Sequence, residues 1–333
     1  MRPNHLRRRD FIRLVGGTAF AWPPSARAQQ PAMPVIGFLS SASRDFDNVY
    51  RLAPFRQGLS ETGYTEGRNV VTEYRGAEHQ LDRLPALAGD LAHRQVSVIA
   101  AGGSPVSALA AKAATTTIPI VFTNAADPVE IGLVASLNRP GGNVTGVTQL
   151  GAELGAKRLG LLHELVPSAT SVAVLVNPAR PGVDAQVAQA QEAARALGLQ
   201  LHILKASSER DFDAIFLTLV QLRAGALVIS ADALFNDQRD QIVALARRRS
   251  VPTIYEWRDA VEAGGLISYG TRRLDAYRQI GILAGRILKG EKPADLPVLQ
   301  PTEFELVINM KTAKALGLTI PPGVLAIADE VIE

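Results

Sequence analysis

The chain has 333 residues, which exceeds the usual size of one domain, so two lobes are expected. Hydrophobic residues make up 47% and charged residues 20%, as in globular α/β proteins. Cysteine is absent, which excludes disulfides, thiolate catalysis and cysteine-ligated metal sites.

The first 28 residues are expected to be a twin-arginine export signal. RRRDFIR at 7–13 precedes a moderately apolar stretch at 14–22, and an A-x-A cleavage pattern follows at 26–28. The apolar part is shorter than the ~20 residues that a membrane span needs. We therefore expect a periplasmic protein that is cleaved near Ala28. The alternative is a basic amphipathic helix that the mature protein keeps.

Removing this segment changes the charge balance. Residues 1–28 contain six arginines and one acid, a net +5, whereas the whole chain carries +3. The mature part therefore carries −2, and it has no basic stripe with interleaved aromatic residues. Nucleic acid is not expected as a partner.

Downstream of the signal, apolar runs alternate with amphipathic stretches in two successive series. Strands are expected at 35–40, 70–74, 96–101, 118–122, 143–148, 172–176, 199–204, 226–229, 251–255, 266–269 and 304–309. Helices are expected at 49–62, 81–93, 106–114, 129–137, 153–165, 185–197, 211–222, 236–249 and 274–288, with a short one ending at 316. The first and third strands are mostly apolar throughout, which is typical of parallel strands covered on both faces. This order predicts two similar α/β lobes with parallel sheets.

The stretch 118–146 is expected to form one wall of a ligand cleft and to lead into a hinge strand. Its apolar run ends in a polar turn at 123–127, and a glycine-rich segment then leads into 143–148. α/β proteins hold ligands where a strand ends in such a turn. Elements left over after the two series imply that the chain crosses between lobes more than once, as in a hinge that closes on a ligand.

The sequence lacks recognisable catalytic and cofactor motifs. It contains no G-x-G-x-x-G, no phosphate-binding loop and no G-x-S-x-G elbow. His163 and Glu164 are not followed by the second histidine of a zinc protease, and the other histidines lack metal-ligand spacing. We expect no enzyme, no cofactor and no bound metal.

Six segments together resemble a known family: FRQGLSETGYTEGRNV (55–70), AATTTIPIVF (113–122), DPVEIGLVASLNRPGGNVTGV (127–147), KRLGLLHELVP (157–167), EAGGLISYG (262–270) and FELVINMKTAKALGLTIPP (304–322). From Val35 to Glu333 the chain resembles the ABC-transporter substrate-binding proteins typified by the tryptophan-binding protein of some Gram-positive bacteria. The resemblance implies a type I periplasmic-binding fold, with three hinge crossings and a ligand between two Rossmann-like lobes. The expected boundaries are 33–147 with 270–295 for the first lobe, and 148–269 with 296–333 for the second.

The resemblance also implies a role. Family members deliver a solute to a membrane permease that an ATPase drives. We therefore expect a monomeric periplasmic receptor that binds an amino acid or a related small carboxylate and meets an ABC permease in the inner membrane. Two alternatives stay open: a sensing subunit that presents its closed form to a receptor kinase, and a cleft enzyme with Glu256 or Asp232 as base.

Carrying the fold over places the ligand at the strand ends. The candidate residues are Ser40, Ser41, Gly103, Ser104, Thr123, Asn124 and Asp127 in the first lobe, and Asn177, Asp232, Tyr255 and Glu256 in the second. N–H groups after Gly103 and the Ser104 hydroxyl are expected to hold a carboxylate, and Asp232 or Glu256 to accept from an ammonium group. Tyr255, Trp257 or Phe38 is expected to supply an aromatic wall.

Several candidates have structural alternatives. Ser104, Asp127 and Asp232 are each placed to cap a helix. Phe38 fits a core position. The charged residues in the first loop (Arg44, Asp45 and Asp47) either reach the ligand or are only solvated.

Overall fold

The strands form two separate sheets within residues 33–149 and 153–333, the part of the chain that this computed structural model describes. The expected export signal at 1–28 lies outside the described residues. The first sheet has the order β2-β1-β3-β4-β5, with parallel neighbours throughout. Its strands are β1 (Val35–Ser40), β2 (Val71–Gly76), β3 (Val98–Gly102), β4 (Ile120–Asn124) and β5 (Val144–Thr148).

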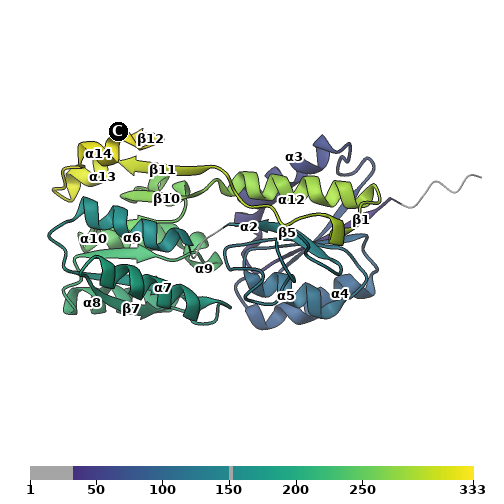
Figure 1. Ribbon diagram of the computed structural model, residues 1–333, viewed down its shortest axis with the longest axis horizontal. Helices are drawn as coiled ribbons and strands as arrows, with labels where there is room; N and C mark the ends of the chain where they lie inside the picture. Colours follow the sequence, from purple (N-terminus) through teal and green to yellow (C-terminus); the bar gives the residue numbers. More distant parts are fainter. Residues whose placement is uncertain (1–32, 150–152) are drawn as a thin grey trace, which may run out of the picture. The chain divides into compact units, whose positions relative to one another are not determined.

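The first sheet and the helices around it are called the first lobe (Figure 1). These helices are α2 (Arg44–Asp47), the π-helical turn η1 (Asn48–Leu52), α3 (Ala53–Glu61), the 3₁₀ turn η2 (Leu81–Arg83), α4 (Leu84–His93), α5 (Pro105–Ala114), α12 (Arg273–Leu288) and the 3₁₀ turn η4 (Pro293–Asp295). α12 comes late in the chain but packs beside α3 and against β3, β4 and β5 (Figure 1).

The second sheet and its helices form the second lobe. The sheet has the order β12-β11-β10-β9-β8-β6-β7. Its strands are β6 (Ser171–Val176), β7 (Gln200–Lys205), β8 (Ala226–Ile229), β9 (Thr253–Tyr255), β10 (Ile267–Thr271), β11 (Phe304–Asn309) and β12 (Glu330–Ile332). Its helices are α6 (Glu153–Leu165), α7 (Val183–Ala196), η3 (Glu209–Asp211), α8 (Phe212–Gln221), α9 (Ala233–Asp237), α10 (Arg239–Arg248), α11 (Arg258–Glu262), α13 (Met310–Ala315) and α14 (Pro322–Ala326).

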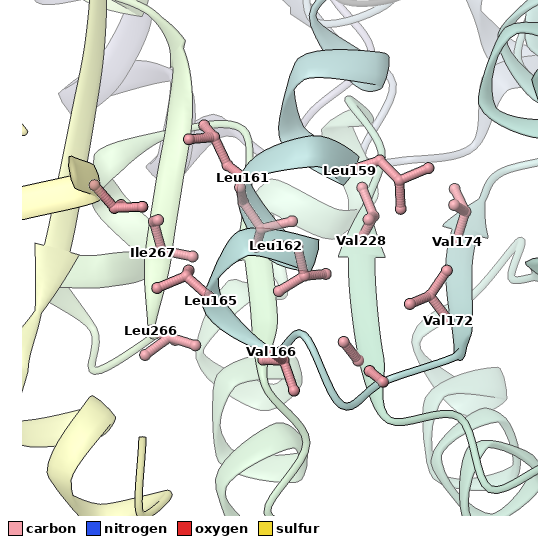
Figure 2. Packing of buried hydrophobic residues seen from close by; sticks show 14 of the residues in the cluster. Leu159, Leu161, Leu162, Leu165, Val166, Val172, Val174, Val228, Leu266 and Ile267 are labelled. Atoms are coloured by element: carbon pink, nitrogen blue, oxygen red, sulfur yellow. The ribbon is translucent and has the colours of Figure 1, made fainter. Parts of the chain in front are cut away.

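The central strands of both sheets are buried on both faces, as their apolar composition predicts. Along β6, Val172 and Val174 belong to one apolar cluster, while Ala173 and Leu175 belong to the cluster on the opposite face. This follows from the alternation of side chains along a strand. Figure 2 shows the first of these clusters, in which Leu162 of α6 packs over the strands. Each fully buried Leu or Val contributes about 1.5–3 kcal/mol relative to an exposed one.

The chain passes between the two lobes three times: after β5, after β10, and between η4 and β11. β10 runs out of the second sheet toward α12 of the first lobe, and the chain returns through β11. β10 and β11 are therefore antiparallel, although the other neighbours in this sheet are parallel. Near the crossings, β10 continues to Thr271, and Leu296 and Val298 still pack in the first lobe.

The prediction of a helix at 129–137 is wrong. This segment consists of turns, in which the N–H of Gly132 bonds to Val129 O and that of Leu133 bonds to Pro128 O. Gly132 has a φ of +69°, a left-handed conformation that interrupts a right-handed helix. The apolar spacing that suggested a helix instead places Leu133 and Val134 in the core of the first lobe.

The helix expected at 236–249 is divided. α9 ends at Asp237 and α10 begins at Arg239, because Gln238 leaves the helical conformation between them with a ψ of +19°. The structure also contains α11, α14 and β12, which the apolar pattern did not predict. Each of these elements is only three to five residues long, too short for a periodic pattern to show.

Candidate ligand-binding site

Residues at strand ends of both lobes border two neighbouring cavities. The first, here called the arginine cavity, has Arg51, Arg180, Asp232, Trp257, Arg273 and Tyr277 among its lining residues. The second, the histidine cavity, is lined among others by Ser41, His79, Asp82 and Asn177. The two share Ser104, Arg180 and Asp232.

The two cavities differ in size. The histidine cavity measures about 240 Å³, and the arginine cavity about 20 Å³, room for about one water molecule. The arginine cavity therefore represents a nearly closed arrangement of the lobes. A solute larger than water reaches it only if the lobes separate.

Ser40 and Ser41 have different environments. The Ser40 hydroxyl accepts hydrogen bonds from Ala42 N at 3.2 Å and from Arg51 Nη1 at 3.3 Å, so it supports the first loop. The Ser41 hydroxyl is buried, has no hydrogen-bond partner among the described residues and lines the histidine cavity. Ser41 is thus the better placed of the two for a ligand.

Ser104 begins α5 in an extended conformation, but its side chain makes no capping hydrogen bond. Its hydroxyl is buried and without a partner within the described part of the chain, and it faces both cavities. The preceding residue, Gly103, donates its N–H to Tyr277 Oη at 3.1 Å, so this particular N–H is already bonded. The capping alternative for Ser104 is not what the structure shows.

The polar segment 123–127, which begins in the last two residues of β4, contains two different kinds of residue. Thr123 and Asn124 are buried and line the arginine cavity, where the Thr123 hydroxyl and Asn124 Nδ2 have no partner among described atoms. Asp127 is exposed, lines neither cavity, and accepts from Val129 N at 2.8 Å and Glu130 N at 3.3 Å. Asp127 thus caps the turn that follows it.

Asn177 and Asp232 are joined in the second lobe. Asn177 Nδ2 donates to Asp232 Oδ1 at 3.2 Å, and the same oxygen accepts from Leu234 N at 2.9 Å, which caps α9. Asp232 therefore has the expected capping role and also lines both cavities. Burial raises the pKa of its carboxyl group, and the charge of Arg180 opposes that shift.

Tyr255 and Glu256 lie at the end of β9 but line neither cavity. Tyr255 belongs to the apolar core of the second lobe. Both carboxylate oxygens of Glu256 are buried and receive no hydrogen bond from any described residue. Burial raises the pKa of Glu256, while the charges of nearby arginines, Arg158 and Arg180 first, act against it.

Of the three aromatic residues expected at the ligand, Trp257 is the one that lines a cavity. It follows Glu256, lines the arginine cavity and packs with Ala125 of the first lobe and Ala231 of the second. The guanidinium carbon of Arg273 lies 5.0 Å from the centroid of its ring, a cation–π contact. Phe38 lies in the core of the first lobe.

The three arginines that line the cavity were not predicted from the sequence. Arg51 lies four residues after Asp47 on η1, Arg180 follows β6 by four residues, and Arg273 begins α12. Side chains of all three are at most 7% exposed. The i,i+4 spacing of Asp47 and Arg51 was the one available signal, because an arginine in a loop is usually solvated.

Two of these arginines have carboxylate partners. Arg51 Nη1 lies 2.5 Å from Asp47 Oδ1, and Arg273 pairs with Asp259. Asp47, which was expected either to reach the ligand or to be solvated, is fully buried as the partner of Arg51. Its Oδ2 also accepts a hydrogen bond from the Tyr74 hydroxyl at 2.6 Å.

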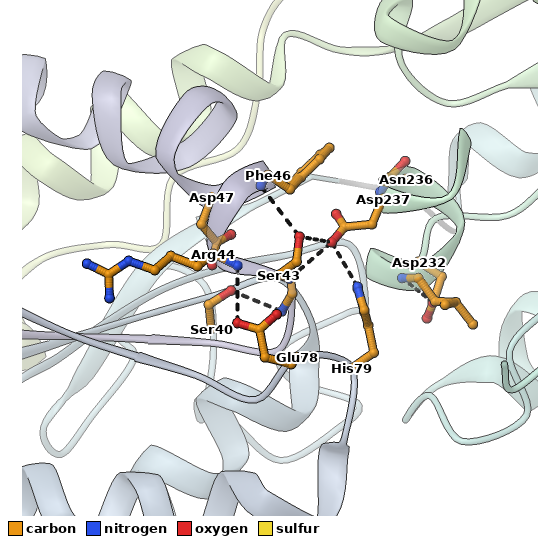
Figure 3. Close-up of polar contacts among 12 residues, drawn as sticks. Ser40, Ser43, Arg44, Phe46, Asp47, Glu78, His79, Asp232, Asn236 and Asp237 are labelled. Carbon is orange, nitrogen blue, oxygen red and sulfur yellow. Dashed lines mark hydrogen bonds and ion pairs between the residues drawn. The ribbon is translucent and has the colours of Figure 1, made fainter. Parts of the chain in front are cut away.

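A polar bridge joins the two lobes beside the cavities (Figure 3). Asp237 Oδ2 of the second lobe accepts from Ser43 N at 3.0 Å and from the Ser43 hydroxyl at 2.7 Å. The same oxygen lies 2.8 Å from His79 Nε2. A second contact runs from Arg239 Nη2 to Tyr50 Oη at 3.2 Å.

No group of three or more histidine and acidic side chains suited to a metal ion occurs in the described part of the chain. Among the helices formed by residues 33–149 and 153–333, none has the length and apolar character that crossing a membrane requires.

Residues 35–332 match the family described as ABC transporter substrate binding protein. The chain belongs to this family. The expectation of a binding protein that is not an enzyme agrees with this assignment.

Individual proteins are similar to this chain in sequence and in fold. The chain is 29% identical over 265 residues to the tyrosine-binding protein of Clostridioides difficile, covering 79% of this chain and 75% of that protein. It is 26% identical to an ABC domain from Streptococcus pneumoniae solved in complex with L-Trp, with a TM-score of 0.82 and 90% and 99% of the two chains covered.

A more distant structure shares only the fold. The leucine-binding protein from Thermotoga maritima is 13% identical, with a TM-score of 0.57 and 77% and 81% of the two chains covered. The expected type I periplasmic-binding fold, with two α/β lobes, is confirmed.

Proposed function

We propose that this protein is the periplasmic solute-binding component of an ABC importer, and that it captures an amino acid or a related small carboxylate between its lobes. The observation that carries the proposal is the arginine cavity. Buried polar atoms from both lobes, among them the Ser104 hydroxyl, Asn124 Nδ2 and Trp257 Nε1, line it without partners in the described structure. Buried polar groups are normally hydrogen-bonded, so a ligand that bridges the lobes is the natural source of the missing acceptors.

The named ligands of the relatives support a carboxylate. Tyrosine and tryptophan, for which two similar proteins are named or solved, both carry a carboxylate group. Of the predicted residues, Gly103, Ser104, Thr123, Asn124 and Asp232 belong to this proposed site. The monomeric state and the permease partner are part of the same proposal. So are lobe boundaries close to the expected ones (33–147 with 270–295, and 148–269 with 296–333), shifted so that β10 through Thr271 stays in the second lobe and Leu296 and Val298 stay in the first.

Thermal unfolding of the mature protein against a solute panel tests the ligand class. A solute at about 100 times its Kd adds ~2.7 kcal/mol to the free energy of unfolding and raises the Tm. The panel contains amino acids, amine-free carboxylates and neutral sugars as the control class. A Tm that rises only with sugars would contradict a carboxylate ligand.

Fractionation of cells that express the full chain tests the location. Replacing both Arg8 and Arg9 by lysine is expected to keep the protein in the cytoplasm, because the arginine pair is the feature on which twin-arginine export depends. The paired substitution of Arg2 and Arg27 by lysine serves as the matched control. Periplasmic protein from the first variant would contradict export by this route.

A further inference from the structure

The unsatisfied groups of the arginine cavity are hydrogen-bond donors. Four are N–H groups that only donate: Arg51 Nε, Asn124 Nδ2, Trp257 Nε1 and Arg273 Nε. Two others are the hydroxyls of Ser104 and Thr123, which both donate and accept. None of the six has a partner among the described residues, so a ligand here has to present acceptors.

Arg180 is the cation of this cavity that lacks a carboxylate partner. Its Nη1 donates to Gln186 Oε1 at 3.2 Å and to the backbone oxygen of Ala231. Asp232 and Glu256 influence it through their charge, but no carboxylate within 33–149 and 153–333 forms an ion pair with it. Buried charges are normally paired, and Arg180 is only 7% exposed and lines both cavities. Arg180 is therefore the residue of this cavity best suited to bind an anionic group of a ligand.

The lining of the arginine cavity offers fewer acceptors for a cationic group than donors for an anion. Asp232 is the one carboxylate among the described lining residues of the arginine cavity, against three arginines. Its Oδ1 is already occupied by Leu234 N and Asn177 Nδ2. Asn124 Oδ1 accepts from Ala126 N at 3.0 Å, and Tyr277 Oη accepts from Gly103 N. Arg51 and Arg273 are each paired with a carboxylate that does not line the cavity, so an ammonium group placed here would meet mainly the charge of Arg180, with few free acceptors for its protons.

We propose that the ligand of this cleft is a small organic carboxylate without an ammonium group, held through its carboxylate by Arg180. This inference rests on the proposed function and narrows its ligand class to amine-free acids. The apolar contact of Ala125, Ala231 and Trp257 opens when the lobes separate and is suited to an apolar part of the same ligand.

Isothermal titration calorimetry on the mature protein compares matched pairs of solutes. The pairs are L-tyrosine with 3-(4-hydroxyphenyl)propanoate, L-tryptophan with 3-(indol-3-yl)propanoate, L-phenylalanine with 3-phenylpropanoate, and L-glutamate with glutarate. Within the pair that binds, the amine-free acid is expected to bind at least about tenfold more tightly, which corresponds to ~1.4 kcal/mol.

The possible failures are distinguishable. An amino acid that binds as tightly as its amine-free partner, or more tightly, overturns the inference and leaves the proposed solute-binding function in place. Sugars that bind while no carboxylate does overturn both the inference and the proposed ligand class.

Variants of the two charged lining residues test the site itself. Arg180→Gln is expected to weaken binding of the amine-free acid about 30-fold or more, equivalent to ~2 kcal/mol. Arg180→Lys, which keeps the charge but loses the planar fork, should retain part of that affinity. Arg248→Gln, at a guanidinium that is 68% exposed on α10, is the matched control and should bind like the parent.

Asp232→Asn tests whether the Asp232 carboxylate contributes to binding of the amine-free acid. Asparagine preserves the cap of α9, so the fold is expected to remain. Binding of the amine-free acid should be unchanged or tighter, because the variant removes a negative charge near the bound anion. Weaker binding of the acid to folded Asp232→Asn, or unchanged binding to folded Arg180→Gln, would overturn the proposal. Thermal unfolding of each variant establishes that it is folded.

Discussion

A single residue, Gly103, allows the first lobe to pack closely beside the cleft. It follows β3 with a φ of +88°, a conformation that favours glycine. A Cβ added here would lie 2.5 Å from the Ser41 hydroxyl and 3.1 Å from that of Ser40. The absence of a side chain therefore allows the ends of β1 and β3 to meet beside the cavities.

Gly103→Ala is expected to lower both stability and ligand affinity. The left-handed φ costs about 1–2 kcal/mol for alanine, and displacement of Ser41 adds about 1–3 kcal/mol. Urea unfolding and calorimetry measure the two effects. Gly132→Ala is the matched control, because Gly132 has a φ of +69° but open space around it, so only the first cost applies. Equal losses in the two variants would show that crowding at Ser41 is unimportant.

Among the elements, α3 and α12 form the contact that ties the late part of the chain to the first lobe. Glycines lie where the two helices approach: Gly58 on α3, and Gly281 and Gly285 on α12. A Cβ on Gly281 would overlap the backbone oxygen of Phe55 and lie 3.0 Å from Leu59 N. Backbone atoms cannot rotate away, so any side chain here separates the helices.

Gly281→Ala is expected to reduce the free energy of unfolding by about 1–3 kcal/mol, the usual cost of overpacking. Gly89→Ala is the matched control on an exposed face of α4, where an added Cβ meets nothing within 4 Å. That variant should gain about 0.5–1 kcal/mol, because alanine is the better helix former. Denaturant midpoints of both proteins give the comparison, and a stabilised Gly281→Ala would contradict the close packing of α3 and α12.

In the molecule as a whole, Asp237 joins the two lobes (Figure 3). Burial acts to raise the pKa of Asp237, but the hydrogen bond with His79, the charge of Arg51 and the bond from Ser43 outweigh it, so the pKa is lowered. The carboxyl thus ionises more easily in the folded state than in the unfolded state. Its contribution to stability is present above the unfolded pKa of about 3.9 and is lost as pH falls through the folded value.

Asp237→Asn is expected to be about 1–2 kcal/mol less stable than the parent at pH 7, because neutral asparagine replaces charge-assisted bonds with weaker ones. The difference should shrink as pH falls from about 4 through the lowered folded pKa, below which the parent carboxyl is protonated as well. Chemical unfolding of both proteins from pH 3 to pH 7 measures it. Asp240→Asn, at a 75% exposed carboxylate on α10, is the control and should show little difference at any pH. A pH-independent gap for Asp237→Asn would contradict the role of the charge.

Local sequence determined most of the secondary structure. Apolar runs identify strands such as β1 and β6 because a strand buried on both faces needs apolar residues at nearly every position. Strand ends in turn identified Ser104, Thr123 and Asn124 as cavity residues, since parallel strands end at one edge of a sheet. Periodicity failed at 129–137, where the apolar residues pack as turns around Gly132.

Tertiary structure alone decided the chemistry of the cleft. Arg51, Arg180 and Arg273 are more than ninety residues apart from one another along the chain and meet only when the two lobes are folded. Asp127 caps a turn and Tyr255 fills a core, although both lie near the ends of strands, as the cavity residues do. The reason is physical: spacing along the sequence sets which elements form, whereas the charge and hydrogen-bond partners of a buried side chain depend on packing between distant elements.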